Sequence, residues 1–310
     1  MRWATYVSPT DQTARPGVLH NGAIHGLRGT ERLIDLLGDD GGTLAEAGQR
    51  AVADPLEVVA EGDAVLRAPV PAPPSVRDFF AFEEHVVTSN RALGGDIDPE
   101  WYDLPVFYFS NPAAIIGPRD AVRISPGSEQ FDYELEIGAV IGRGGSDLRP
   151  DEAEAHIAGY TIFCDWSARD LQAREMRQNL GPVKGKDTAT SIGPYLVTPD
   201  ELEPARGGNA YNLRMTATVN GKPYSAGTFA DIYWTYGQLL AYASRGTRLV
   251  PGDVIGSGTV GTGCILELSR VHGLAAYPWL RPGDRVKLEV EQLGSMEAEL
   301  QPSIPVIPLR

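Results

Sequence analysis

The chain has 310 residues, of which 42% are hydrophobic and 22% are charged, and its formal net charge at pH 7 is −14. Such an acidic chain lacks the basic surface that nucleic acids and anionic membranes require, and it contains no apolar run long enough to span a bilayer. The two cysteines exclude a disulfide framework and disfavour a metal site built on thiolates. The first residues lack the apolar core of a signal peptide. We therefore expect a cytoplasmic globular protein that binds neither nucleic acid nor membrane.

Residues 1–70 are predicted to form a small N-terminal domain with both strands and helices. Its expected elements are short strands within 7–27, around a turn at 20–22, and helical pieces at 31–37 and 43–53. A proline-rich connector follows over 68–76, because prolines favour extended backbone. We place the boundary near residue 70 and expect 71–310 to form the larger domain.

The larger domain is predicted to be mainly β. It opens with a helix-like stretch over 77–95, with Asp78 as the N-cap and Gly94–Gly95 at the end. Short runs rich in β-branched and aromatic residues follow, and they predict strands at 105–110, 113–118, 132–142, 158–166, 213–221, 253–260, 264–271 and 285–294. Only 150–157 and 235–244 read as helices there. We expect a barrel-like or folded-over sheet.

Acidic residues alternate in the predicted strand "DYELEIG", where Asp132, Glu134 and Glu136 would share one face. A solvated strand face is one explanation, but the stretch contains no Lys or Arg, and it runs into the buried-looking "GAVIG". Asp165 follows another apolar run, where it could equally form a turn. Clustered carboxylates repel one another unless a cation binds them, and oxygen ligands suit Mg²⁺, Mn²⁺ or Ca²⁺. The pattern favours a hard-metal site.

His85 is the candidate base among five histidines. It stands seven residues after Asp78, which is two helical turns and would place both on one helix face. The alternative is a half-exposed surface histidine. Glu267 lies in an apolar run, where a buried charge requires a polar partner, and it is a candidate partner for the imidazole.

Five stretches together resemble the fumarylacetoacetate hydrolase family: "DFFAFEEH", "FDYELEIGAVIG", "CDWSARDLQ", "GPVKGKD" and "GSGTVGTGCILEL", in order along residues 72–300. The resemblance implies a mixed β-sandwich or β-roll catalytic domain behind a small N-terminal α+β domain. It also implies a site for Mg²⁺ or a similar ion. The ligands it implies are Glu134, Glu136 and Asp165, together with Asp78. Asp132 is not a ligand in this family, so we assign it a supporting role.

The resemblance also implies roles for residues around the metal. His85, oriented by Glu267, would be the base, and Lys186 a further catalytic residue. The implied substrate-binding residues are Tyr108, Arg169, Gln172 and Thr259. Two positions depart from the family pattern: Cys164 replaces an Asn, and Phe80 replaces a Tyr. The second change removes one polar contact and argues against fumarylacetoacetate itself as the substrate.

The function that these residues favour is metal-dependent hydrolysis of a C–C bond in an acylpyruvate or other β-diketo acid, because a His–Glu pair can activate water. An isomerase of 2-hydroxy-dienoates or a decarboxylase of oxaloacetate-type diacids is the alternative on the same metal site. A metal-dependent binding protein without turnover is a third. The resemblance further implies a small oxo-acid substrate, a homodimer, and a source of substrate in the ring-cleavage products of aromatic compounds.

Overall fold

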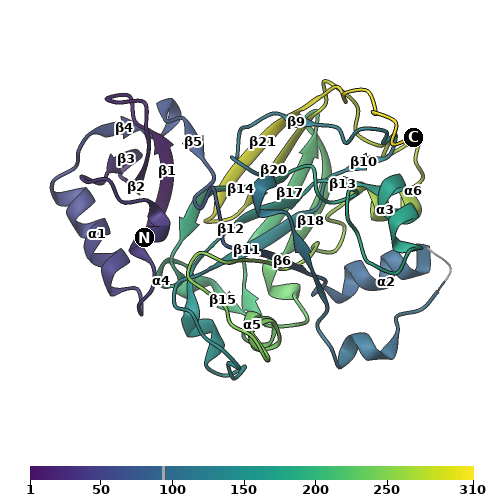
Figure 1. Ribbon diagram of the computed structural model, residues 1–310, viewed down its shortest axis with the longest axis horizontal. Coiled ribbons are helices and arrows are strands. Elements are labelled where there is room, and N and C mark those ends of the chain that lie inside the picture. Colours follow the sequence, from purple (N-terminus) through teal and green to yellow (C-terminus); the bar gives the residue numbers. More distant parts are fainter. Residues whose placement is uncertain (93–94) are drawn as a thin grey trace.

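The computed structural model describes residues 1–92 and 95–310, and it confirms a mainly β fold (Figure 1). Two sheets carry most of the strands. The first residues of the chain form a unit at one side of the molecule, and the C-terminus lies at the opposite side (Figure 1). None of the described helices is both long and apolar enough to cross a membrane.

The N-terminal unit contains β1 (Arg2–Val7), β2 (Ala14–His20), β3 (Ala23–Gly26), α1 (Gly42–Ala53), β4 (Val58–Ala60) and β5 (Leu66–Arg67). Of these elements, β2, β3 and α1 match the predicted ranges, whereas β1, β4 and β5 were not predicted. The expected helix at 31–37 is only a 3₁₀ turn over Leu33–Leu36. Strand β1 pairs with β14 of the larger unit through Trp3 and Leu196. The N-terminal strands therefore extend the main sheet of the larger unit.

The main sheet runs in the order β4-β3-β2-β1-β14-β12-β11-β19-β6-β7. Its strands beyond the N-terminal unit are β6 (Val76–Phe79), β7 (Phe107–Ser110), β11 (Leu135–Ile141), β12 (Ile157–Asp165), β14 (Thr190–Val197) and β19 (Val254–Gly256), with β8 (Ile115–Ile116) paired to β14. Every residue of β11, β12 and β14 is buried. These strands are covered on both faces, which is why their sequences read as continuous apolar runs rather than alternating ones.

A second sheet, in the order β18-β17-β20-β21-β9, packs against the first. Its strands are β9 (Val122–Arg123), β17 (Arg214–Val219), β18 (Lys222–Thr228), β20 (Arg285–Val290) and β21 (Gly294–Gln301). Short pairs form between β10 (Phe131–Asp132) and β13 (Ser167–Ala168), and between β15 (Arg206–Gly207) and β16 (Ala210–Tyr211). Ile137 and Ile162 of the main sheet share one buried cluster with Leu288 and Met296 of the second. The core of the larger unit lies between the sheets, as the folded-over prediction requires.

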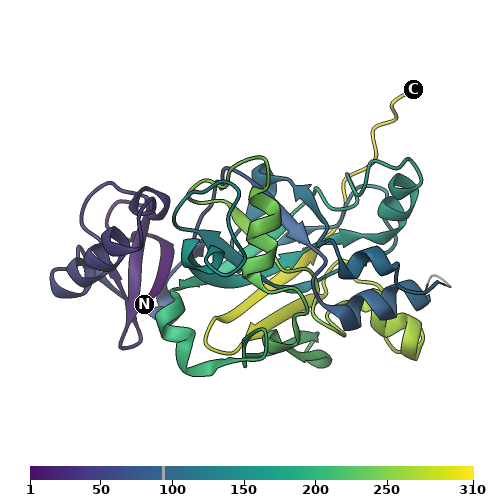
Figure 2. The same ribbon diagram turned by 90° about the horizontal axis from the view of Figure 1, so that it is seen from below.

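Three helices gather at the end of the molecule opposite the N-terminal unit, in both views (Figure 1, Figure 2). They are α2 (Glu83–Ala92), α3 (Arg169–Met176) and α6 (Ile265–His272). The remaining helices are α4 (Pro199–Leu202) and α5 (Tyr236–Ser244). Helix α5 matches its prediction and begins with a capping box between Thr235 and Gln238. The helix expected at 150–157 is a 3₁₀ turn over Ala153–His156.

The helix expected over 77–95 is wrong in its first half. Residues Val76–Phe79 form β6, which pairs in parallel with β19 and antiparallel with β7, and α2 begins only at Glu83. Asp78 is therefore a strand residue, neither an N-cap nor on one helix face with His85. Pairing with two distant strands overrides the local helical pattern. The helix end that we placed at Gly94–Gly95 involves Gly94, which lies outside the described residues.

The strand expected over 264–271 is also wrong, because Ile265–His272 form helix α6. Its buried side chains include Ile265, Leu268 and Ser269, a helical spacing that an apolar run of this length does not distinguish from a strand. The carboxylate of Asp132 accepts hydrogen bonds from the backbone N–H groups of Ile265 and Leu266. This distant acceptor satisfies donors at the start of the helix.

Candidate metal and catalytic site

Four carboxylates that the sequence singles out meet in the structure. Asp78 comes from β6, Glu134 stands just before β11, Glu136 lies in β11, and Asp165 ends β12. One carboxylate oxygen of each lies within 4.8 Å of the others. The strands β6, β19, β11 and β12 are neighbours in the main sheet, so residues as far apart along the chain as Asp78 and Asp165 converge at one place.

This carboxylate cluster is buried, with at most 5% of any of its four residues exposed. Burial raises the pKa of Asp78, Glu136 and Asp165, and the neighbouring negative charges raise it further. The Oδ1 atoms of Asp78 and Asp165 are buried and have no hydrogen-bond partner among the described residues. Unsatisfied, converging oxygens of this kind fit a hard divalent cation such as Mg²⁺, Mn²⁺ or Ca²⁺.

Two buried cations border the carboxylate cluster. The Lys186 ammonium contacts Glu134 and lies 2.5 Å from Asp165 Oδ2, and Arg169 Nη2 lies 2.8 Å from Glu134 Oε1. Burial alone would raise the pKa of Glu134, but the charges of Lys186 and Arg169 outweigh it and hold that pKa well below its usual range. Arg169 also pairs with a further acid, Asp132, so the acidic side chains outnumber the two cationic ones. A divalent cation would neutralise the remaining negative charge.

Hydroxyl and amide groups fix the orientation of the carboxylates. Tyr108 donates to Asp165 Oδ2 at 2.5 Å and to Asp78 Oδ2 at 3.1 Å. Glu136 accepts from the Gly258 N–H at 3.0 Å and from the Thr259 hydroxyl at 3.4 Å. Tyr108 and Thr259, which the family resemblance implies as substrate-binding residues, thus touch the carboxylate cluster itself.

Gly256 of β19 lies directly against the carboxylate cluster. A Cβ at this position would collide with Asp78 Oδ1, 3.1 Å from Asp78 Cγ and 3.3 Å from Glu136 Oε2. Any side chain here would occupy the space between two of the carboxylates. The absence of a side chain at this position is a requirement of the site.

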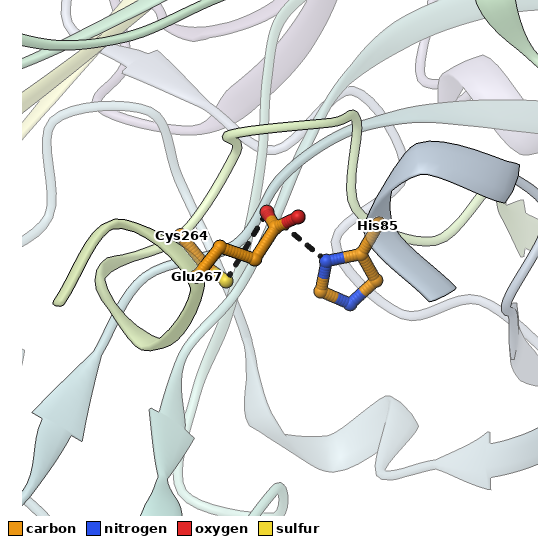
Figure 3. A group of neighbouring side chains, drawn as sticks. All are labelled: His85, Cys264 and Glu267. Carbon is orange, nitrogen blue, oxygen red and sulfur yellow. Dashed lines mark hydrogen bonds and ion pairs between the residues drawn. The ribbon is translucent and has the colours of Figure 1, made fainter. Parts of the chain in front are cut away.

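His85 and Glu267 form a second constellation, the His–Glu dyad (Figure 3). His85 comes from α2 and Glu267 from α6, and Nδ1 of the imidazole lies 3.1 Å from Oε2 of the carboxylate. Their side chains are 5% and 2% exposed, so the contact is shielded from water. Phe80 packs edge-on against the imidazole at 5.2 Å between ring centres. The carboxylate favours the tautomer with the proton on Nδ1, which leaves Nε2 able to accept a proton.

The dyad is tied to the carboxylate cluster through backbone and side chains. Cys264, the residue before α6, forms an isolated β-bridge with Glu134. Asp132 accepts from the first N–H groups of α6, which carries Glu267, and it also receives the Arg169 guanidinium at 2.9 Å and 2.8 Å. Asp132 therefore supports both constellations without joining the carboxylate cluster, in agreement with its assigned role.

Gln172 lies at the edge of the site on α3. Its side-chain oxygen accepts from Arg169 at 3.3 Å, and the side chain is half-buried. A Cβ on Gly185 would come within 2.7 Å of the Gln172 backbone nitrogen, so the loop that carries Lys186 packs tightly on α3. The candidate residues named from the sequence thus lie around the carboxylate cluster and the dyad.

One neighbour of the dyad was missed by the sequence analysis. Cys264 is fully buried, and its thiol lies 3.6 Å from Glu267 Oε2 (Figure 3). The signal was available, since Cys264 stands three residues before Glu267 in "GCILEL". It went unused because that stretch reads as a strand, in which positions three apart point to opposite faces.

Comparison with known proteins identifies relatives with several activities. The family model described as "Fumarylacetoacetate (FAA) hydrolase C-terminal" matches residues 75–301. The chain is 29% identical over 257 residues to a mitochondrial oxaloacetate tautomerase of Homo sapiens, a match that covers 83% of this chain and 76% of the relative. It is 32% identical to a fumarylacetoacetase of Arabidopsis thaliana over 62% of this chain and 57% of that protein.

Solved structures agree on the fold. A probable 2-hydroxyhepta-2,4-diene-1,7-dioate isomerase from Mycobacterium abscessus superposes with a TM-score of 0.71 at 25% identity, over 98% of this chain and all of that one. A fumarylacetoacetate hydrolase from Exiguobacterium antarcticum also gives 0.71 at 25% identity, over 97% and 99% of the two chains. The family match spans most of the chain, and it includes every residue of the carboxylate cluster and the dyad. The chain belongs to the fumarylacetoacetate hydrolase family.

Proposed function

We propose that this protein is a divalent-metal-dependent hydrolase that cleaves a C–C bond in an acylpyruvate or a related β-diketo acid. The observation that carries the proposal is the buried contact between His85 and Glu267 beside the carboxylate cluster. A base held in one tautomer next to a metal site is what water activation requires. Similarity to a fumarylacetoacetase and to a fumarylacetoacetate hydrolase supports the same reaction class.

Asp78, Glu134, Glu136 and Asp165 would hold the metal. A bound Mg²⁺ or Mn²⁺ supplies Lewis acidity toward the two oxygens of an enolisable dicarbonyl. The ammonium of Lys186 and the guanidinium of Arg169 border the same place and would stabilise negative charge that develops on the substrate. These cations also offer partners for the carboxylate of an oxo acid.

The His–Glu dyad would transfer a proton from water to the substrate. Nε2 of His85 takes a proton from water while Glu267 stabilises the imidazolium through Nδ1. The hydroxide adds to the acyl carbonyl, the bond between the acyl carbon and the methylene breaks, and the electron pair remains on the pyruvate enolate. The imidazolium then protonates the methylene carbon of the enolate, which restores the neutral imidazole of His85. Acylpyruvate and water thus give a carboxylic acid and pyruvate.

The second candidate function is isomerisation or tautomerisation of a 2-oxo acid, with oxaloacetate-type decarboxylation as a variant. The similarity to an oxaloacetate tautomerase and to a probable dienedioate isomerase favours it. The same His85 could shuttle a proton between carbon and oxygen with no attack by water. The two functions share the metal site and differ only in what the base does.

The experiment that separates them begins with protein stripped by a chelator and refilled with Mg²⁺ or Mn²⁺. The ultraviolet absorbance of an acylpyruvate panel is followed, and products are identified by mass. We expect metal-dependent formation of pyruvate and a carboxylic acid, reduced about 10²–10⁴-fold in His85→Ala and unchanged in a surface control, His20→Ala. Tautomer exchange or CO₂ release from oxaloacetate without cleavage would move the function to the second candidate. Metal binding with no turnover on any oxo acid would indicate a binding protein.

Three further features are proposed apart from the site. The composition leads us to expect that the protein acts in the cytoplasm. The family resemblance leads us to expect a homodimer and a substrate that comes from ring-cleavage products of aromatic compounds. Sedimentation of the purified chain tests the dimer directly. The boundary near residue 70 remains a prediction as well, and β1 continues the main sheet across it.

A further inference from the structure

Cys264 lies beside the His–Glu dyad and adds a sulfur atom to its nitrogen and oxygen atoms. His85, Glu267 and Cys264 each offer one potential ligand atom, and these nitrogen, oxygen and sulfur atoms lie within 4.8 Å of one another (Figure 3). All three side chains are at least nine-tenths buried. Oε1 of Glu267 is buried without a hydrogen-bond partner among the described residues, and Nδ1 of His85 has the 3.1 Å contact with Glu267 Oε2. An imidazole nitrogen, an unsatisfied carboxylate oxygen and a thiol thus face one another inside the protein.

Two of the three spacings among these atoms are close to those of a tetrahedral metal site. Zinc bonds of about 2.0–2.1 Å to nitrogen and oxygen and about 2.3 Å to sulfur give tetrahedral edges of about 3.3–3.5 Å. Two of the edges are 3.1 Å from His85 Nδ1 to Glu267 Oε2 and 3.6 Å from Cys264 Sγ to the same oxygen. The third edge, from the imidazole to the thiol, is within 4.8 Å. Binding of the ion would draw the imidazole and the thiol toward each other around Glu267, and a fourth position would remain open.

We propose that His85, Cys264 and Glu267 form a second metal site, selective for a borderline-soft cation such as Zn²⁺ and separate from the carboxylate cluster, and that its occupation inhibits the enzyme. Mixed nitrogen, sulfur and oxygen ligands select zinc over Mg²⁺, whereas the four carboxylates select the hard ion. Binding releases the thiol proton to solvent, so the site then offers a thiolate and a carboxylate to the dication.

Inhibition follows from the imidazole tautomer. A neutral imidazole that binds zinc through Nδ1 carries its proton on Nε2. Nε2 then cannot accept a proton from water, and Glu267 is no longer available to stabilise an imidazolium. This part of the inference rests on the proposed function, because it requires His85 to be the base. The binding of the metal ion does not depend on the proposed function.

Cobalt spectroscopy tests the binding without any assay of activity. Protein stripped of metal and reduced is first saturated with Mg²⁺ and then titrated with Co²⁺ without oxygen. We expect a near-ultraviolet thiolate-to-cobalt charge-transfer band that saturates at one ion per chain. The sequence has only two cysteines, so Cys164→Ser is the matched control and should keep the band, while Cys264→Ser should lose it. A band in Cys164→Ser assigns the sulfur to Cys264 even if Cys264→Ser does not fold.

Zinc inhibition tests the consequence. At saturating Mg²⁺, the Zn²⁺ concentration that halves the rate should rise at least 10–100-fold in Cys264→Ser, measured against that variant's own zinc-free rate. The absence of a charge-transfer band in the unaltered protein, or its persistence in Cys264→Ser, would overturn the second site. A band without zinc inhibition of an active hydrolase would overturn the inhibitory role alone. If no hydrolysis is found at all, the proposed function fails while the spectrum still decides the site.

Discussion

Gly256→Ala is the substitution whose effect on metal binding follows most directly from the structure. The new methyl group would collide with Asp78 Oδ1 and come within 3.3 Å of Glu136 Oε2. The Asp78 carboxylate must turn away, and its bonds to Tyr108 and to the metal are disturbed. Disturbing the groups that orient a metal ligand typically weakens binding 10–100-fold. We expect that loss here, with an additional cost of about 1–3 kcal/mol to the metal-free fold from overpacking.

The assay is unfolding with and without Mg²⁺. At a concentration of about 100 times the dissociation constant, a bound ion adds about 2.7 kcal/mol to the free energy of unfolding. A hundredfold weaker site at the same concentration would add only about 0.4 kcal/mol. Gly62→Ala is the control, since a Cβ at the exposed Gly62 meets no atom within 4 Å. Equal stabilisation by Mg²⁺ in Gly256→Ala and in the unaltered protein would refute the assignment of Asp78 as a ligand.

Three other predictions test the site. Glu136→Ala should abolish both turnover and the Mg²⁺-dependent gain in stability, and retention of either the ion or full activity would contradict its role as a ligand. Asp132→Ala should cost about 3–5 kcal/mol in urea unfolding, because it leaves the buried Arg169 short of a partner and uncaps α6; a loss below about 1 kcal/mol would show that the link is unimportant. The pKa values of Asp78, Glu136 and Asp165 are raised in the metal-free fold, so the native state holds protons that the unfolded chain releases, and metal-free stability should fall as pH rises above the ordinary carboxyl range. The gain from Mg²⁺ should accordingly grow from pH 5 to pH 8 in thermal unfolding, and a gain that shrinks with pH would be evidence against these carboxylates as ligands.

The sequence was most informative where local chemistry and burial agree. Glu134 and Glu136 alternate in a run that continues as buried strand β11, and Asp165 ends an apolar run that is indeed β12. Glu267 stands out as a charge in an apolar stretch, and it lies buried against His85 although the stretch is a helix rather than a strand. An unexplained buried charge is a signal that does not depend on the secondary structure around it.

The remaining features depend on contacts that no local pattern encodes. Asp78 was expected on a helix, because only its pairing with β19 and β7 makes residues 76–79 a strand. The helix α6 begins where a carboxylate more than 130 residues away accepts its first N–H groups. Lys186 reads as a solvated loop residue, and its burial against Glu134 and Asp165 became predictable only through the family resemblance.

The wide separation of the four carboxylates along the chain also bears on the kinetics of folding. Asp78, Glu136 and Asp165 lie in strands β6, β11 and β12, which must be aligned before their oxygens converge. An unfolded chain cannot present this set, so the ion should bind only after most of the sheet has formed. Metal removal should then accelerate unfolding while leaving the refolding rate nearly unchanged. The lifetime of the native protein would thus depend on the concentration of free divalent cation around it.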